Sequence, residues 1–211
     1  MVDKKRLMSF YSRHLFPRLC DWGMRNSRMA RLREEVLAEA DGEILEIGFG
    51  TGLNLEHYPE RVVRLTGVDP NDGMSRLAHS RIEQSRIKVD LRTRTAEELP
   101  FEDGQFDCVV STWTLCSIPE PERAVSEIVR VLRTGGRFLF LEHGLNENPV
   151  VQCWQHALTP LQRKIADGCR LDLDIEGLLR TGSFNEIRVE RFQLERIPRI
   201  VGSMYRGVAV K

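Results

Sequence analysis

A short apolar run that enters a glycine-rich turn constrains the fold of this chain more than any other segment. Residues 44–47 (Ile-Leu-Glu-Ile) are followed directly by residues 48–52 (Gly-Phe-Gly-Thr-Gly). The run predicts a buried strand, and we expect a short helix over 53–57 after the turn. Glycine lets the backbone approach a ligand closely, and a helix N-terminus presents free N–H groups. The segment therefore predicts a ligand site at the end of a strand, with a tight connection that binds nothing as the alternative.

Short β-type runs alternate with helical stretches through the rest of the chain. The expected strands cover residues 44–47, 62–68, 87–91, 106–111 and 136–141. The expected helices between them cover 73–85 and 122–132. Such alternation is typical of βαβ units, and it predicts an α/β fold with a parallel sheet covered on both faces.

The C-terminal part follows a different pattern. After a helix over 175–180, apolar runs cover 184–192 and 204–210. The link between these runs is too short for a helical crossover, so we expect an antiparallel pair at the sheet end. Residues 144–170 interrupt the alternation and are predicted to form a helical insertion.

Two helices are expected ahead of the first strand. The first has residues at helical spacing: Leu7, Phe10, Tyr11, His14 and Leu15. Pro17 is expected to end or bend it, and a second helical pattern covers 26–40. We therefore predict a helical lid, residues 1–40, over the active site of one domain that spans 41–211.

Composition excludes several classes of protein. The 211 residues include 31 basic and 31 acidic side chains, so the formal net charge is zero, which disfavours a general nucleic-acid binder. No apolar run approaches the roughly 20 residues of a membrane span, and no secretory signal is visible. Five cysteines without a C-x-x-C pair make a disulfide framework or a structural zinc site unexpected. A cytoplasmic location is the expectation.

Two acidic residues specify the kind of ligand. Asp69 ends the second expected strand, where a carboxylate can accept both hydroxyls of a ribose; a surface Asp in a turn before Pro70 is the alternative. Glu46 lies just before the glycines, whose spacing is G-x-G-x-G rather than the dinucleotide pattern G-x-G-x-x-G. An acid there suits a cationic amino-acid group better than a pyrophosphate. The residues thus favour S-adenosylmethionine over NAD.

The chain resembles the class I S-adenosylmethionine-dependent methyltransferases. The matching segments are 45–52, 67–70, 96–101, 106–110 and 131–137, although Thr134 stands where the family usually has Pro. The resemblance implies a Rossmann-like, doubly wound seven-stranded sheet of order 3-2-1-4-5-7-6 with the last strand antiparallel.

A closer similarity, to the microsomal alkyl thiol S-methyltransferases and their bacterial relatives, extends over most of the chain. It rests on segments 114–117, 142–143, 154–155, 167–169 and 209–211. Those microsomal proteins have a hydrophobic N-terminal anchor, which we do not see here. The similarity implies methyl transfer to a small thiol, such as hydrogen sulfide, methanethiol or an alkyl thiol.

The resemblance also implies roles for particular residues. Cofactor binding is expected of Glu46, Gly48, Phe49, Gly50, Gly52, Asn54, Asp69, Pro70, Asn71, Ala96, Glu97, Ser111 and Thr112. Glu46 is placed near the amino group, Asp69 at the ribose, and Ala96 and Glu97 at the adenine. Glu97 as an ordinary helix-start acid remains an alternative.

Catalytic and substrate-binding residues are expected on the other side of the transferring methyl group. His143 is the best base candidate, with a structural histidine as the alternative, and Asp167 is expected to orient it or the substrate. Cys116 is the third predicted catalytic residue. Substrate contacts are expected of Tyr11, His14, Trp113 and Trp154, although Trp113 also fits a plain core position. We predict no metal; a three-thiol metalloid site of Cys116, Cys153 and Cys169 is a less favoured alternative.

Two further functions remain as alternatives. The first is N- or O-methylation of a phospholipid headgroup or a quinol, because residues 1–35 carry nine basic and four acidic side chains and could touch an anionic membrane peripherally. A solvated helix surface explains the same charges. The second is a non-catalytic cofactor-binding protein. We expect a monomer or homodimer with a small-molecule methyl acceptor and no nucleic-acid partner.

Overall fold

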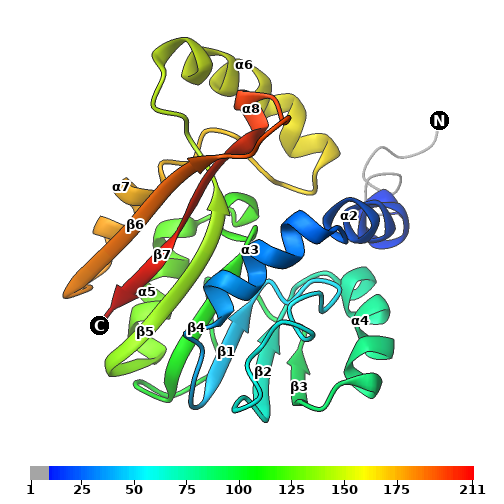
Figure 1. Ribbon diagram of the computed structural model, residues 1–211, viewed down its shortest axis with the longest axis vertical. Coiled ribbons are helices and arrows are strands. Elements are labelled where there is room, and N and C mark those ends of the chain that lie inside the picture. Colours follow the sequence, from blue (N-terminus) through cyan, green and yellow to red (C-terminus); the bar gives the residue numbers. More distant parts are fainter. Residues whose placement is uncertain (1–9) are drawn as a thin grey trace.

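The computed structural model describes residues 10–211, and its centre is one sheet of seven strands in the order β3-β2-β1-β4-β5-β7-β6 (Figure 1). Leu7 and the basic residues 4–6 of the N-terminal pattern lie outside the described residues. The strands are β1 (Ile44–Ile47), β2 (Arg64–Val68), β3 (Lys88–Arg92), β4 (Phe106–Thr112), β5 (Leu132–His143), β6 (Glu186–Gln193) and β7 (Ser203–Val210). Strands β1 to β5 pair in parallel, and β7 is antiparallel to both neighbours. The predicted order and the antiparallel end are confirmed.

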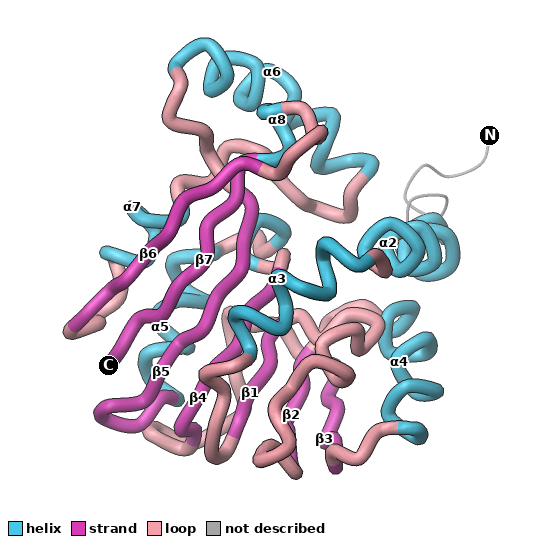
Figure 2. The backbone as a smooth tube through the Cα atoms, viewed as in Figure 1, coloured by secondary structure: helices cyan, strands magenta, loops and turns pink. Residues whose placement is uncertain are grey.

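Helices cover both faces of the sheet (Figure 2). They are the π-helix η1 (Tyr11–Leu15), α2 (Phe16–Met24), α3 (Ser27–Leu37), α4 (Asp72–Gln84), the 3-10 turn η2 (Leu115–Ser117), α5 (Pro121–Val131), α6 (Pro149–Ile165), α7 (Ile175–Arg180) and α8 (Arg199–Gly202). One core cluster joins α5 and α7 to the sheet, and a second joins α3 and α4 to the opposite face. Helix α5 shows why: its buried residues recur at Ala124, Val125, Ile128 and Val131, one stripe of a helix.

Position in the sheet decides the burial of each strand. All four residues of the central β1 are buried, while the edge strand β3 alternates between exposed and half-buried residues. The other edge strand, β6, carries exposed Glu and Arg side chains, which discourage pairing with another chain. Because β1 is covered on both faces, the side chain of Glu46 in its middle is buried.

One local prediction needs correction. No helix forms over 53–57; the segment makes tight turns, with Leu55 N–H donating to Gly52 O and His57 N–H donating to Asn54 O. The connection from β1 to β2 therefore folds as turns, and these turns point Asn54 and Tyr58 toward Glu46. Pro17 stands where the first helix was expected to end or bend: the π-helix η1 ends at Leu15, and Pro17 lies in the first turn of α2, where its missing N–H costs little.

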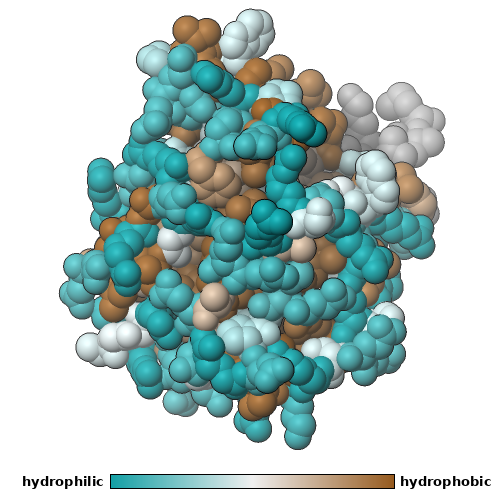
Figure 3. Space-filling view, viewed as in Figure 1, coloured by the Kyte–Doolittle hydropathy of each residue, from teal (hydrophilic) through white to brown (hydrophobic). Residues whose placement is uncertain are grey.

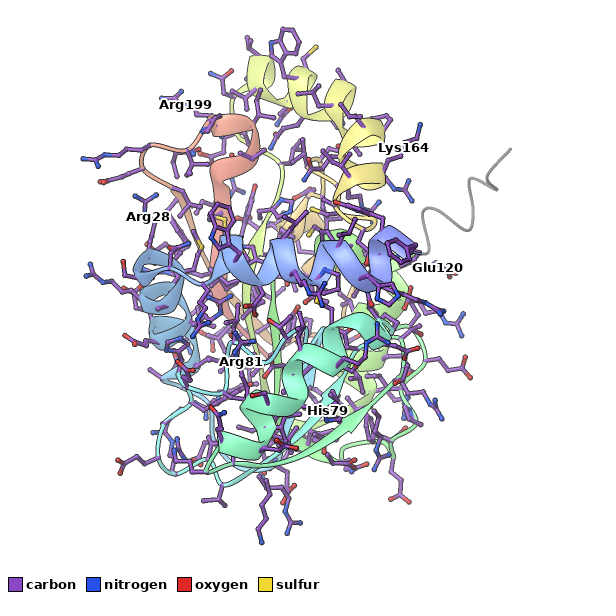
Figure 4. All side chains as sticks on the ribbon, turned by 90° about the vertical axis from the view of Figure 1, so that its right-hand side faces the viewer. Arg28, His79, Arg81, Glu120, Lys164 and Arg199 are labelled. Atoms are coloured by element: carbon purple, nitrogen blue, oxygen red, sulfur yellow. The ribbon has the colours of Figure 1, made fainter. Side chains whose placement is uncertain are left out.

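Side-chain contacts hold helix α2 over the C-terminal edge of the sheet. Figure 4 shows α2 between α4 and α6, with Arg81 of α4 beneath it. Arg81 forms an ion pair with Asp21 of α2 at 2.8 Å, and Thr51 Oγ1 donates to the same carboxylate at 2.6 Å. These contacts hold α2 over the C-terminal ends of β1 and β2.

Gly207→Ala is expected to destabilise the fold by about 2–4 kcal/mol. Gly207 lies in the middle of β7, and an added Cβ would meet the backbone oxygen of Arg188 and approach the ring of Phe140 to 2.9 Å. Thermal unfolding followed by circular dichroism measures the change.

Gly23→Ala is the matched control. A Cβ at Gly23 in α2 meets nothing within 4 Å, and alanine has the higher helix propensity. The control should therefore leave the melting temperature unchanged or raise it. Equal losses of stability in both variants would contradict the packing around β7.

Candidate functional site

A cavity of about 510 Å³ lies at the C-terminal ends of β1, β2 and β4, under the N-terminal helices. Ligands of open α/β sheets bind at this edge. The predicted residues in its wall are Glu46, Gly48, Phe49, Gly50, Asn54, Asp69, Pro70, Asn71, Ala96, Glu97, Thr112, Trp113 and Asp167. Most residues predicted from the sequence to bind a cofactor thus share one cavity.

The glycine turn forms the floor of the cavity. Gly48, Gly50 and Gly52 have φ values of +66°, +59° and +78°, a region that side chains rarely adopt. A Cβ on Gly48 would collide with the side chain of Thr114. Gly50 N–H donates to Asp69 Oδ2 at 2.8 Å, which links the turn to the end of β2. Gly52 lies outside the cavity wall, where it closes the turn against Phe49 and Leu55.

A buried carboxylate and an unpaired amide oxygen mark one end of the cavity. Glu46 accepts hydrogen bonds from Tyr58 Oη at 2.7 Å and from Asn54 Nδ2 at 2.9 Å. Burial raises the pKa of Glu46 to about 7, and the two hydrogen bonds oppose the rise. Asn54 Oδ1 is buried without a hydrogen-bond partner among the described residues. Two acceptors in one place fit a cation with several N–H groups, such as an α-ammonium.

Arg33 was not predicted from the sequence, yet it reaches the same end of the cavity. The side chain is only 5% exposed, its guanidinium lies 4.8 Å above the ring of Trp113, and its Nε is unpaired among the described atoms. One donor of the guanidinium reaches Met24 O at 3.1 Å. Arg33 could therefore bind a carboxylate. The signal was present, since Arg33 stands on the apolar stripe of α3 that contains Met29 and Val36.

A second carboxylate lies across the cavity, at the end of β2. Asp69 accepts from Gly50 N–H and from Asn71 N–H, each at 2.8 Å. Burial raises its pKa to about 6, while these two backbone bonds lower it. Ala96 and Glu97, after β3, line the wall beside it. This end suits a hydroxylated sugar and an adjoining flat base.

The end of β4 is shaped by a second residue that the sequence prediction omitted, Glu142. The Glu142 carboxylate is buried and accepts from Ser111 Oγ at 2.6 Å and from Thr114 N–H at 2.9 Å. Ser111 is thereby held below the wall instead of lining it. Trp113, between Ser111 and Thr114, adopts a φ of +52°. A bulky residue keeps this conformation only where its surroundings enforce it. The enforced turn places the Trp113 ring at the cavity.

Asp167 has partners other than those predicted. Its carboxylate accepts from Ser12 Oγ at 2.7 Å and from Asn71 Nδ2 at 2.9 Å, so it joins η1 to the start of α4 instead of orienting His143. Tyr11 Oη donates to Ile165 O, which ties η1 to α6 nearby. These contacts close the cavity from above.

Several predicted residues lie outside the cavity wall. His14 is exposed and contacts Phe10, and Trp154 is 57% exposed on the outer side of α6. His143 and Cys116 lie behind the wall and contact Cys169. The alternative three-thiol site is not formed, because Cys153 is exposed on α6 and His143 takes its place in the cluster.

The sheet order, the glycine turn and the two buried carboxylates define an α/β protein that binds a nucleoside with a charged amino-acid tail. Known proteins agree: residues 45–140 match the family described as a methyltransferase domain. Human thiol S-methyltransferase TMT1A is 33% identical over 198 residues, which cover 88% of this chain and 81% of the human protein. The chain belongs to the S-adenosylmethionine-dependent methyltransferase family, and S-adenosylmethionine is its methyl donor.

Other relatives act on different acceptors. Phosphatidylethanolamine N-methyltransferase of Cereibacter sphaeroides is 36% identical over 137 residues, 64% of this chain and 66% of that protein. Among solved structures, phosphoethanolamine N-methyltransferase 2 of Haemonchus contortus has a TM-score of 0.73 at 17% identity, over 100% of this chain and 61% of that one. YcgJ of Bacillus subtilis has a TM-score of 0.65 at 20% identity, over 88% and 96%. The structural likenesses establish the fold alone.

Glu46→Gln is expected to weaken S-adenosylmethionine binding about 10- to 100-fold, because it removes the charge facing the ammonium. In the wild type the affinity should fall by roughly tenfold per pH unit below pH 7, as Glu46 takes up a proton. Isothermal titration calorimetry from pH 5.5 to 7.5 measures both effects.

The variant should lose the pH dependence between pH 6 and 7.5 and keep only the fall below pH 6 from Asp69. Its melting temperature at pH 7.5 without cofactor should be equal or higher, since a carboxyl group whose pKa is raised by folding destabilises the fold above its unfolded-state pKa. A wild-type affinity that is flat from pH 5.5 to 7.5 would contradict the assignment.

Arg33→Met is expected to lower the affinity for S-adenosylmethionine at least about tenfold, the loss of one charge-assisted contact. Arg31→Met, on the exposed side of the same helix, is the control and should bind as the wild type does. Calorimetry with decarboxylated S-adenosylmethionine sharpens the test, because Arg33→Met should not weaken the binding of a ligand that lacks the carboxylate.

Proposed function

We propose that this protein transfers a methyl group from S-adenosylmethionine to a small thiol. The observation that carries the proposal is the similarity to thiol S-methyltransferases along 88% of the chain, which is more of the chain than residues 45–140, the part that matches the general methyltransferase domain. Support also comes from the cavity wall, which is largely apolar around Phe16, Met24, Trp113 and Ile118.

The cavity offers a place for each part of the cofactor. Glu46, Asn54 and Arg33 would hold its amino-acid tail, Asp69 its ribose, and Ala96 with Glu97 its adenine. The glycine turn would pass beneath the sulfur. When bound, the cofactor supplies a methyl group on a positively charged sulfur, and the protein has to position the acceptor in line with it and exclude water.

The acceptor side favours sulfur over oxygen or nitrogen. Within residues 10–211 the wall contains no histidine, and the carboxylate of Asp167 is already engaged by Ser12 and Asn71. An alcohol or ammonium acceptor needs a base to remove its proton, whereas a thiol, with a pKa of about 8.5 in cysteine, is partly ionised at neutral pH and strongly nucleophilic. Cys20, in the wall itself, does not compete, because burial raises its pKa to about 11.

Methylation of a phospholipid amine is the second candidate function. One relative is a phosphatidylethanolamine N-methyltransferase. In addition, α2 exposes Leu19 and Trp22, the latter 82% exposed, beside Arg18 and Arg25, a combination that suits the surface of an anionic membrane. Apolar side chains also gather over α6, at the top of Figure 3. No helix within residues 10–211 has the length and apolarity needed to cross a membrane.

A panel of methyl acceptors distinguishes the two functions. We expect turnover with sulfide, methanethiol and a short alkyl thiol, measured as S-adenosylhomocysteine formation and as the methylated product by mass spectrometry. Phosphatidylethanolamine vesicles and a quinol should give at least about tenfold less product. Turnover of the vesicles or the quinol without any thiol turnover would overturn the proposal.

A further inference from the structure

Three side chains that bind soft metals converge behind the cavity wall. Cys116 lies in η2, His143 ends β5, and Cys169 lies in the loop after α6. The sulfurs of Cys116 and Cys169 are 3.6 Å apart, and His143 Nε2 is 2.9 Å from the sulfur of Cys169. All three ligand atoms lie within 4.8 Å of one another. Segments that are far apart in the sequence thus bring two thiols and one imidazole to a single point.

The geometry is close to that of a tetrahedral zinc site. With Zn–S bonds of about 2.3 Å and Zn–N bonds of about 2.0 Å, ligand sulfurs are about 3.8 Å apart and S···N distances are about 3.5 Å. The observed 3.6 Å and 2.9 Å separations are close to these values, and the third pair, Cys116 and His143, lies within 4.8 Å. Two sulfurs and a nitrogen favour Zn²⁺ over Mg²⁺ or Ca²⁺, which prefer oxygen ligands.

The backbone holds the three residues in place before any metal binds. The Arg170 N–H donates to Cys116 O at 3.0 Å, which joins the two cysteine segments directly. Thr114 N–H donates to Glu142, and His143 is in register with Met204 of β7. The ligands therefore need little reorganisation, which favours tight binding.

We propose that Cys116, His143 and Cys169 bind a Zn²⁺ ion and that the open fourth coordination position takes the acceptor thiol. No fourth Cys, His, Asp or Glu joins the group among residues 10–211. Three protein ligands with an open position are the pattern of catalytic zinc sites, whereas structural sites have four.

The open position lies next to the cavity. Ser117, which follows Cys116, and Asp167, two residues before Cys169, both line its wall. Cys116 is buried, His143 and Cys169 are partly buried, and none of the three lines the wall, so the metal would lie just behind it. A small thiol in the cavity could reach a metal at this point, and the role as acceptor site rests on the proposed function.

Coordination would prepare the thiol for methylation. The S–H bond breaks when the sulfur binds the metal, and the proton leaves to solvent. The sulfur lone pair then forms the new S–CH₃ bond while the methyl group's bond to the sulfonium sulfur breaks. The products are a thioether and neutral S-adenosylhomocysteine, and the thioether, a weak ligand without charge, leaves the metal.

Metal binding to the full chain tests the site without any assay of activity. With the reductant tris(2-carboxyethyl)phosphine, which contains no thiol, we expect one Zn²⁺ per chain in competition with a chromogenic chelator. Co²⁺ should give the thiolate charge-transfer bands and strong visible bands of tetrahedral coordination. Cys169→Ser and His143→Gln should each lower Zn²⁺ affinity about 100-fold or more.

Cys153→Ser is the matched control, because it removes an exposed thiol on α6 and should bind Zn²⁺ as the wild type does. S-adenosylmethionine binding by Cys169→Ser confirms that the variant is folded. Absence of stoichiometric Zn²⁺ binding, or equal affinities in the wild type and both ligand variants, would overturn the site.

A short alkyl thiol added to the Co²⁺ protein tests the fourth position. The visible bands should shift in the wild type, and unchanged bands would overturn the role in acceptor binding. A shift without methylation of that thiol would leave the metal site in place and refute the proposed function. Methylation of that thiol by a protein that binds no Zn²⁺ would support the proposed function and overturn the metal site.

Discussion

Burial of the Glu46 carboxylate in the middle of a central strand is the constraint on which the site depends. A carboxylate removed from water is costly unless it is hydrogen-bonded and paired with positive charge. Tyr58 and Asn54 supply the hydrogen bonds, and Arg33 lies near enough to lower the pKa of the acid. The remaining demand for positive charge suits this end of the cavity to a ligand that carries an ammonium group.

The parts of the fold with a strong pattern could be predicted from the sequence. Strand–helix alternation and the short link before residue 204 lead to the sheet, and the resemblance to a family supplies its order. The helix expected over 53–57 fails because a five-residue pattern cannot show that Asn54 and Tyr58 turn toward Glu46. Arg33 was not predicted because an arginine on a helix is normally expected to point to solvent.

The acceptor side was less predictable than the cofactor side. The cofactor residues follow strand ends, whose relative positions a parallel sheet fixes. Trp113 and Asp167 depend on left-handed backbone conformations, and Asp167 on hydrogen bonds to segments 96 and 155 residues away. Which thiols meet is likewise a matter of tertiary structure: Cys153 lies near the start of α6 and Cys169 in the loop after it, yet only Cys169 meets Cys116 and His143.

The contact of Ser12, Asn71 and Asp167 has a consequence for turnover. These residues come from η1, the start of α4 and the loop after α6, and their hydrogen bonds cross the roof of the cavity. If these hydrogen bonds have to open before S-adenosylhomocysteine leaves and a fresh donor enters, product release is a step separate from the chemistry, and the rate at which this roof opens then limits the cycle.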